Sequence, residues 1–150
     1  MEIQELHSQA MELADKADLL KKQGKADEAG ALFRQSLEAE RKAAIAARQQ
    51  QTGEPTESVL FRSAATLAYT IGDYREAERL VCLGLAGNPP AEITEELRNL
   101  YDTVSMERNI SQIDASSVST EQESVTITIP IRERNLLNVL VRKFGWACVF

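Results

Sequence analysis

The stretch that most constrains the fold is residues 67–90, LAYTIGDYREAERLVCLGLAGNPP, which predicts two helices joined by a tight turn. Gly72 can adopt the left-handed backbone that ends a helix. Asp73 can cap the next helix, with Glu76 three residues later as its capping-box partner. The two prolines that close the stretch end the second helix, because proline lacks a backbone N–H and clashes with the preceding turn. We therefore expect an antiparallel helical hairpin here.

The beginning of the chain predicts a similar hairpin around Gly24. Residues 2–23 read as one long helix, because apolar residues recur at alternating spacings of three and four. A second helix is expected from residue 27 to about residue 51, and a polar loop with Gly53 and Pro55 follows it. The apolar stripe of the first helix consists of Ile3, Leu6, Ala10, Leu13, Ala17 and Leu20.

The two hairpins correspond to each other at one constant offset, which aligns Gly24 with Gly72 and Ala29 with Ala77. Their pattern resembles the tetratricopeptide repeat, a helix-turn-helix unit of about 34 residues. The offset is longer than this unit, and the excess fits a lengthened second helix and the polar loop. The resemblance implies stacked hairpins that bind a protein or peptide and do not catalyse a reaction. The residues that carry it are Leu13, Ala17, Leu20, Gly24, Ala29 and Phe33, then Phe61, Ala65, Ala68, Gly72, Asp73, Tyr74, Ala77 and Pro89.

The same resemblance implies that the first helix of each pair lines a partner groove. The residues it places there are Asp18, Lys21 and Lys22 in the first hairpin and Arg62, Thr66 and Tyr69 in the second. Family members that clamp a carboxylate use Lys and Asn at set positions of this groove. Other residue types stand at those positions here, so we do not expect a clamp for a chaperone C-terminus.

Two more helices complete the expected helical domain, residues 1–108. Residues 56–71 form the first helix of the second hairpin, and Thr56 or Ser58 can cap it. Residues 91–108 form a fifth helix, which we interpret as the solubilising cap of the array. The fold class is therefore mostly α, with about five helices in tetratricopeptide-like antiparallel hairpins.

The end of the chain changes in character. Residues 109–123 have no clear period and are expected to form a linker. In the tail, residues 124–150, Val125, Ile127 and Ile129 alternate with threonines, which predicts a β-strand. A short helix follows from residue 133 to residue 144.

A lone strand leaves its backbone donors and acceptors unpaired, so it needs a partner. Three partners fit: the same strand of a second copy in a homodimer, a strand of another protein, or residues 112–120 of the same chain. The tail also loosely resembles a strand-helix segment of bacterial antitoxin-like proteins, and the first half of a ribbon-helix-helix domain without its second helix. The alternative function is therefore an antitoxin-like or transcriptional regulator whose tail dimerises or docks on a toxin or DNA.

The charge distribution argues against nonspecific nucleic-acid binding by the whole chain. The net charge is −6. Residues 125–150 carry four cations against one carboxylate, or +3, so the remainder carries −9. An acidic body repels the phosphate backbone. No apolar run approaches the roughly 20 residues that span a bilayer, and no signal peptide is visible. We expect a bacterial-type cytoplasmic protein whose partner is another protein or peptide.

The sequence contains no pattern typical of an enzyme or a cofactor site. The only histidine, His7, is expected at the surface or half-buried, and one histidine cannot build a zinc site alone. Cys82 is expected in the core, and it forms no metal-binding spacing with Cys148. The carboxylates are expected on solvated faces, with no buried pair to act as acid and base. We therefore expect no catalysis, cofactor or metal.

Overall fold

The computed structural model describes residues 3–112. They form five α-helices, and no strand occurs among them, which confirms the mostly helical class for this part of the chain. The predicted strand with Val125, Ile127 and Ile129, and the helix after it, lie outside the described residues. The helices are α1 (Ile3–Lys22), α2 (Ala26–Gln49), α3 (Thr56–Thr70), α4 (Tyr74–Leu85) and α5 (Ala91–Gln112).

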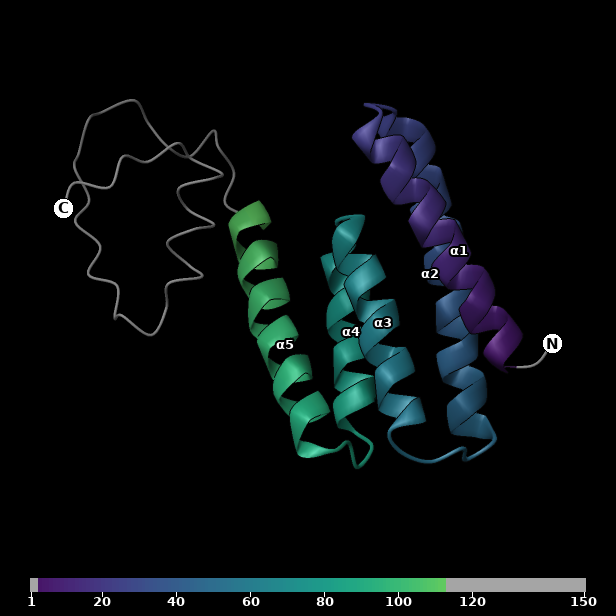
Figure 1. The fold of residues 1–150 in the computed structure, drawn as a ribbon. Coiled ribbons are helices and arrows are strands. Elements are labelled where there is room, and N and C mark those ends of the chain that lie inside the picture. Colours follow the sequence, from purple (N-terminus) through teal and green to yellow (C-terminus); the bar gives the residue numbers. More distant parts are fainter. Residues whose placement is uncertain (1–2, 113–150) are drawn as a thin grey trace, which may run out of the picture. The chain divides into compact units, whose positions relative to one another are not determined.

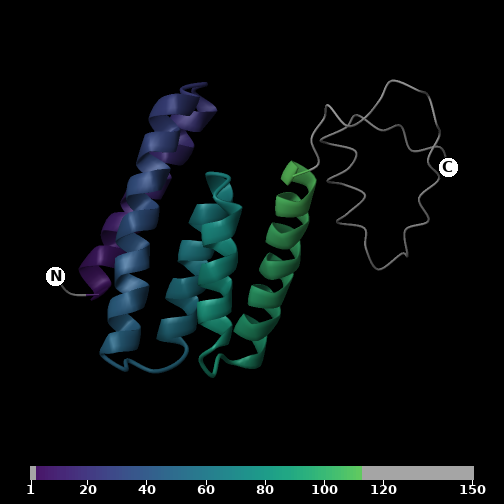
Figure 2. The ribbon, with the colours of Figure 1, turned by 180° about the vertical axis from the view of Figure 1, so that it is seen from behind.

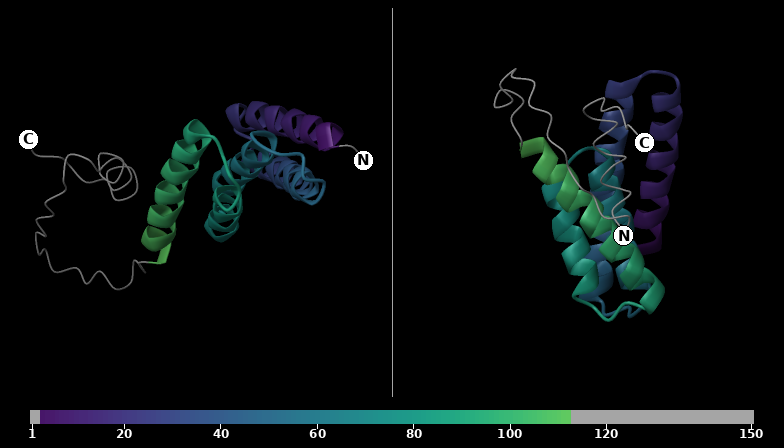
Figure 3. Two further views of the ribbon diagram at one scale, coloured as in Figure 1. Left: turned by 90° about the horizontal axis from the view of Figure 1, so that it is seen from below. Right: turned by 90° about the vertical axis from the view of Figure 1, so that its left-hand side faces the viewer.

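The chain divides into two units, residues 1–104 and residues 105–150, and α5 crosses the boundary. Within the first unit, α1 pairs with α2, α2 with α3, and α3 with α4 (Figure 1). In Figure 1, α1 and α3 lie in front of α2 and α4. Figure 2 is the view from behind, and there α2 and α4 lie in front. The first helices of the two hairpins therefore share one face of this unit. Figure 3 gives the view from below and a side view in which α1 and α2 lie next to each other.

The turns of the two hairpins have the same backbone geometry. Gly24 and Gly72 have φ values of +79° and +80°. The N–H of Lys25 donates to the carbonyl of Leu20, and the N–H of Asp73, at the corresponding position of the second hairpin, donates to the carbonyl of Ala68, both at 3.0 Å. These are the bonds of a helix end closed by a left-handed glycine. The sequence prediction of both turns is confirmed.

The caps of the second helices differ between the hairpins. The carboxylate of Asp73 accepts a hydrogen bond from the N–H of Glu76 at 3.1 Å, so the predicted cap of α4 is confirmed. Lys25 stands at the corresponding position before α2 and makes no side-chain cap.

A small residue follows each turn and lets the paired helices approach closely. Ala29 is 2% exposed and Ala77 is fully buried. The core around them is rich in alanine and contains two buried phenylalanine rings, Phe33 and Phe61. Small side chains at these positions let the helix backbones pack close together, so the core is filled although the sequence contains few aromatic residues.

The long offset between the two hairpins has a structural explanation. Helix α2 has 24 residues, whereas α4 has 12, so the second helix of the first hairpin is twice as long. The loop from Gln50 to Pro55 then connects it to α3. The additional turns of α2 carry Arg48, whose side chain reaches both helices of the second hairpin.

Arg48 joins three helices through one guanidinium group. Its Nε donates to Glu57 of α3 at 2.6 Å, and its Nη2 donates to the carbonyl oxygen of Leu83 in α4 at 2.5 Å. The guanidinium carbon also lies 4.4 Å from the centre of the Phe61 ring. Arg48 thereby fixes α2 against the second hairpin.

Three sequence predictions of local structure are wrong. Cys82 is exposed, not part of the core, because it lies on the outer face of α4. Neither Thr56 nor Ser58 caps α3: the residue before the helix is Pro55, and the carboxylate of Glu54 accepts from the N–H of Ser58 at 3.1 Å. Helix α5 also continues to Gln112, beyond its predicted end at residue 108.

Candidate functional site

The residues predicted to line a groove lie on α1 and α3, the first helices of the two hairpins. On α1, Asp18, Lys21 and Lys22 are all exposed in the last two turns. On α3, Thr66 is exposed, and its hydroxyl donates to the carbonyl of Arg62 one turn earlier. Helices α1 and α3 lie on one face of the first unit, and two pockets are lined by residues near the ends of both helices.

The first pocket joins the end of α1 to the end of α3. It has a volume of about 230 Å³ and brings Lys21 of α1 near Thr70 and Ile71 at the end of α3. Its floor is formed by residues of α2, including Phe33 and Gly30. The structure therefore brings Lys21 into a hollow with α3, as the predicted groove requires. Asp18 and Lys22 do not line this pocket.

Arg62 and Tyr69, predicted to line the groove, both contact other side chains of the protein. Arg62 donates to the carboxylate of Glu96 in α5. Tyr69 is half-buried, and its ring centre lies 5.9 Å from that of Tyr74 in α4. Arg62 therefore links α3 to α5, Tyr69 links α3 to α4, and Thr66 between them is exposed.

The second pocket lies at the opposite end of α1 and α3 and is larger, about 460 Å³. Its polar lining consists of side chains that can both donate and accept hydrogen bonds. The residues around it are Ile3, Gln4 and His7 of α1, Gln50 and Thr52 of the loop, and Thr56 and Leu60 of α3.

His7 is held in this second pocket by a buried carboxylate. Glu40 of α2 is fully buried, and its two oxygens lie 2.9 and 3.0 Å from Nδ1 of His7. In the tautomer that carries its proton on Nδ1, the imidazole donates to this carboxylate. The His7 side chain is 39% exposed, which agrees with the expected half-buried histidine. Its orientation is fixed by Glu40 rather than by solvent.

Glu40 is a functional-site candidate that sequence reasoning missed. The expectation that all carboxylates lie on solvated faces is wrong for this residue. Its partner is 33 residues away in the chain, so only the register of α1 on α2 brings the two together. The sequence carries no direct signal for this burial; in the structure Glu40 lies one turn after Ser36, which is also buried and donates to the carbonyl of Ala10 at 2.7 Å.

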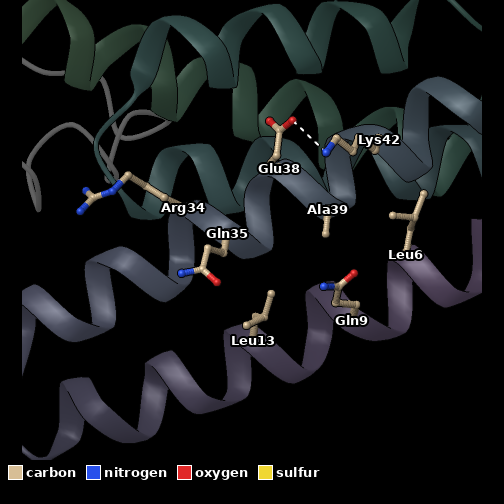
Figure 4. A pocket seen from close by; sticks show the side chains of 8 residues that line it. All are labelled: Leu6, Gln9, Leu13, Arg34, Gln35, Glu38, Ala39 and Lys42. Carbon is tan, nitrogen blue, oxygen red and sulfur yellow. Dashed lines mark ion pairs between the residues drawn. The ribbon is translucent and has the colours of Figure 1, made fainter. Parts of the chain in front are cut away.

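A third pocket lies on the other flank of the α1–α2 pair and contains no residue of α3 (Figure 4). It has a volume of about 580 Å³. Leu13 points from α1 toward α2, and Gln35 and Ala39 point from α2 toward α1. The lining residues are Leu6, Gln9, Leu13, Arg34, Gln35, Glu38, Ala39 and Lys42.

The electrostatics of this third pocket centre on Glu38. Its carboxylate lies 2.6 Å from the Arg41 guanidinium and 3.4 Å from the Lys42 ammonium. Partial burial acts to raise the pKa of Glu38, but the hydrogen bonds and positive charges of Arg41 and Lys42 outweigh it. The pKa of Glu38 therefore lies below its ordinary value.

Residues 3–112 contain no group of three or more His, Cys, Asp or Glu side chains that could hold a metal ion. No helix in this range is long and apolar enough to cross a membrane. Comparison with known proteins found no matching family model, no significantly similar curated protein and no significantly similar solved structure.

Proposed function

We propose that this chain is a noncatalytic protein-interaction module of the tetratricopeptide type. One observation carries the proposal: two successive hairpins repeat the same glycine turn, at Gly24 and at Gly72, with the same hydrogen bonds. Each turn is followed five residues later by a buried alanine, Ala29 or Ala77. A hairpin that repeats in this manner stacks on its neighbour and builds an extended surface from the first helices.

The groove between α1 and α3 is the surface we propose for the partner. Its two ends are hollowed, with about 230 Å³ near Lys21 and about 460 Å³ near His7. Thr66 of α3 is exposed, and we place it in the same groove. A peptide segment is the partner that suits such a surface, because its backbone can use the polar side chains while its side chains occupy the hollows.

The chemistry of the described residues favours binding over catalysis. His7 and Glu40 form a pair, but no nucleophilic Ser, Cys or Lys is hydrogen-bonded to the imidazole among residues 3–112. A histidine-carboxylate pair without a nucleophile or metal orients a polar side chain, which is useful for recognition. Loss of binding, not of a reaction, is the expected result of changing this groove.

A selection experiment tests the proposal on the full chain. A phage-displayed random peptide library is selected on the immobilised protein, and enriched peptides are synthesised and titrated by fluorescence anisotropy. Lys21→Glu and Thr66→Arg should each weaken binding about tenfold or more, because they reverse a charge and fill the groove. Arg98→Glu, a charge reversal on an exposed residue of α5, should change the affinity less than twofold. Failure to enrich peptides, or equal affinity in all variants, would contradict the proposal.

The alternative of an antitoxin-like or transcriptional regulator depends on residues 124–150. These residues lie outside the described part of the chain, so no structural observation favours it. No structural observation favours the predicted homodimer either, because it depends on the same residues. Salt-dependent DNA binding by the full chain would support the regulator, because phosphate contacts release counterions.

A further inference from the structure

The pocket of Figure 4 has the walls and the length of a site for a helix. Both of its walls are helices, α1 and α2, which run antiparallel beside each other. Leu6 and Leu13 line it at a separation of seven residues, which is about 10.5 Å along a helix at 1.5 Å per residue. That length matches the i, i+7 spacing of apolar residues on a partner helix that lies along the groove.

The groove has an apolar floor, and the amide groups of two glutamine side chains line one side of it. Leu6, Leu13 and Ala39 supply the apolar surface. The amides of Gln9 and Gln35, one from each helix, form no hydrogen bond with another residue in the range 3–112. Such a groove can bury two or three aliphatic side chains while the amides serve polar groups of the same partner.

The rim carries an excess of positive charge in an otherwise acidic chain. Arg34 and Lys42 line the groove against a single carboxylate, Glu38. The Glu38 carboxylate pairs with both Lys42, at 3.4 Å, and Arg41, at 2.6 Å. Arg41 also lies 4.0 Å from Glu76 of α4. Arg34 is exposed and forms no ion pair among the described residues. The lining of the groove therefore carries a local charge of +1, which favours an acidic partner at close range although the whole chain carries −6.

We infer that the α1–α2 groove binds an acidic amphipathic helix of a partner protein. The partner's apolar stripe lies on Leu6, Leu13 and Ala39, and its Asp or Glu side chains face Arg34 and Lys42. This surface is distinct from the proposed peptide groove between α1 and α3, since the described residues that line the pockets on the two sides have only Arg34 in common. The chain would thus hold two partner segments at once, one on each flank of the first hairpin.

The test uses a fluorescein-labelled synthetic helix and the full chain. The peptide is alanine-based, with leucines at i, i+3, i+4 and i+7 and glutamates on both sides of this stripe. A matched peptide carries lysines in place of the glutamates. The glutamate peptide should bind saturably and at least tenfold more tightly than the lysine peptide. Its affinity should fall as salt is raised, because rim charges are screened.

Variants of the chain locate the binding surface. Lys42→Glu should weaken the glutamate peptide about fivefold, which corresponds to the upper end of the range for a surface ion pair. Leu13→Gln, which is half-buried and lines the groove, should weaken it about tenfold by removing apolar contact. Lys21→Glu in the other groove and Arg98→Glu on α5 should change the affinity less than twofold.

Each other result overturns the inference. No saturable binding of the glutamate peptide, or equal binding of both peptides, excludes an acidic helix as the occupant. Weakening by Lys21→Glu but not by Lys42→Glu moves the site to the α1–α3 groove and leaves the proposed function standing. If light scattering shows a dimer that Leu13→Gln dissociates while the protein stays helical, the occupant is a second copy of the chain.

Discussion

Arg48 is the residue whose replacement should most clearly show how the two hairpins are held together. We consider Arg48→Met, because methionine keeps an unbranched apolar side chain and removes the charged group. The substitution eliminates the bonds to Glu57 and Leu83 and the contact with the Phe61 ring. All three partners belong to the second hairpin, so the loss falls on the interface between hairpins.

The expected cost follows from these contacts. A hydrogen bond to a charged group contributes about 1.5–3 kcal/mol, and a cation–π contact about 0.5–2 kcal/mol. Glu57 is left without its cation, with only 15% of its side chain exposed. Because Arg48 itself is 32% exposed, water offsets part of the loss. We expect Arg48→Met to lower the free energy of unfolding by about 2–4 kcal/mol.

Urea unfolding followed by far-UV circular dichroism measures this change. Arg79→Met is the matched control, because Arg79 also pairs with a glutamate, Glu76, but within α4 and with 52% of its side chain exposed. The control should change stability by less than about 0.5 kcal/mol. A double-mutant cycle with Glu57→Gln should give a coupling energy of about 1–2 kcal/mol. A cost below about 0.5 kcal/mol for Arg48→Met, or no coupling, would refute the reasoning.

Three further predictions concern single side chains of the first unit. Gly30→Ala should stabilise the protein by about 0.8–1 kcal/mol in thermal unfolding, because an added Cβ meets nothing closer than 3.8 Å. Gly84→Ala should not stabilise the protein, because its Cβ would lie 3.1 Å from Leu97 and 3.2 Å from Phe61. An equal gain at both glycines would contradict the close packing of α4. His7→Ala should cost about 1–2 kcal/mol in urea unfolding, because it leaves buried Glu40 without its hydrogen-bond partner while water can reach the site through the 39% exposed position of His7. Ser8→Ala, an exposed neighbour, should cost less than about 0.5 kcal/mol, and equal effects would show that the pair is unimportant. Because the pKa of Glu38 is lowered in the folded protein, its contribution to stability is present above the ordinary carboxyl pKa and is lost as pH falls through the folded value. Arg41→Met removes a cause of this shift and should raise the pKa of Glu38 in an NMR titration. An unchanged pKa would contradict the assigned cause.

The sequence was sufficient to predict features that depend on local backbone chemistry. Gly24 and Gly72 were placed in their turns because few other residues adopt a positive φ, and Asp73 was placed at a cap because its side chain competes for free N–H groups. The end of the first helix was predicted to within one residue, Lys22 against residue 23, because its apolar stripe is uninterrupted up to the turn.

Features that depend on which face of a helix is covered could not be predicted. Cys82 is a different case: it follows Glu78 and Arg79 by four and three residues, so the helical period places it on the polar face of α4, where it is exposed. The contacts of Arg48 and of Glu40 join residues from different helices, and they depend on the rotation and register of α2 on its neighbours. The pocket of Figure 4 was missed for the same reason, since each helix supplies only one of its walls.

The most direct test of the central claim is an NMR map of a bound peptide on the full chain. The backbone amide signals are assigned, and a peptide enriched by the library selection is titrated into the labelled protein. The proposed function predicts the largest shifts at Lys21 and Thr66, with smaller changes along α2 beneath them. Shifts confined to other surfaces, or no binding by any selected peptide, would contradict the groove between α1 and α3 as the partner site.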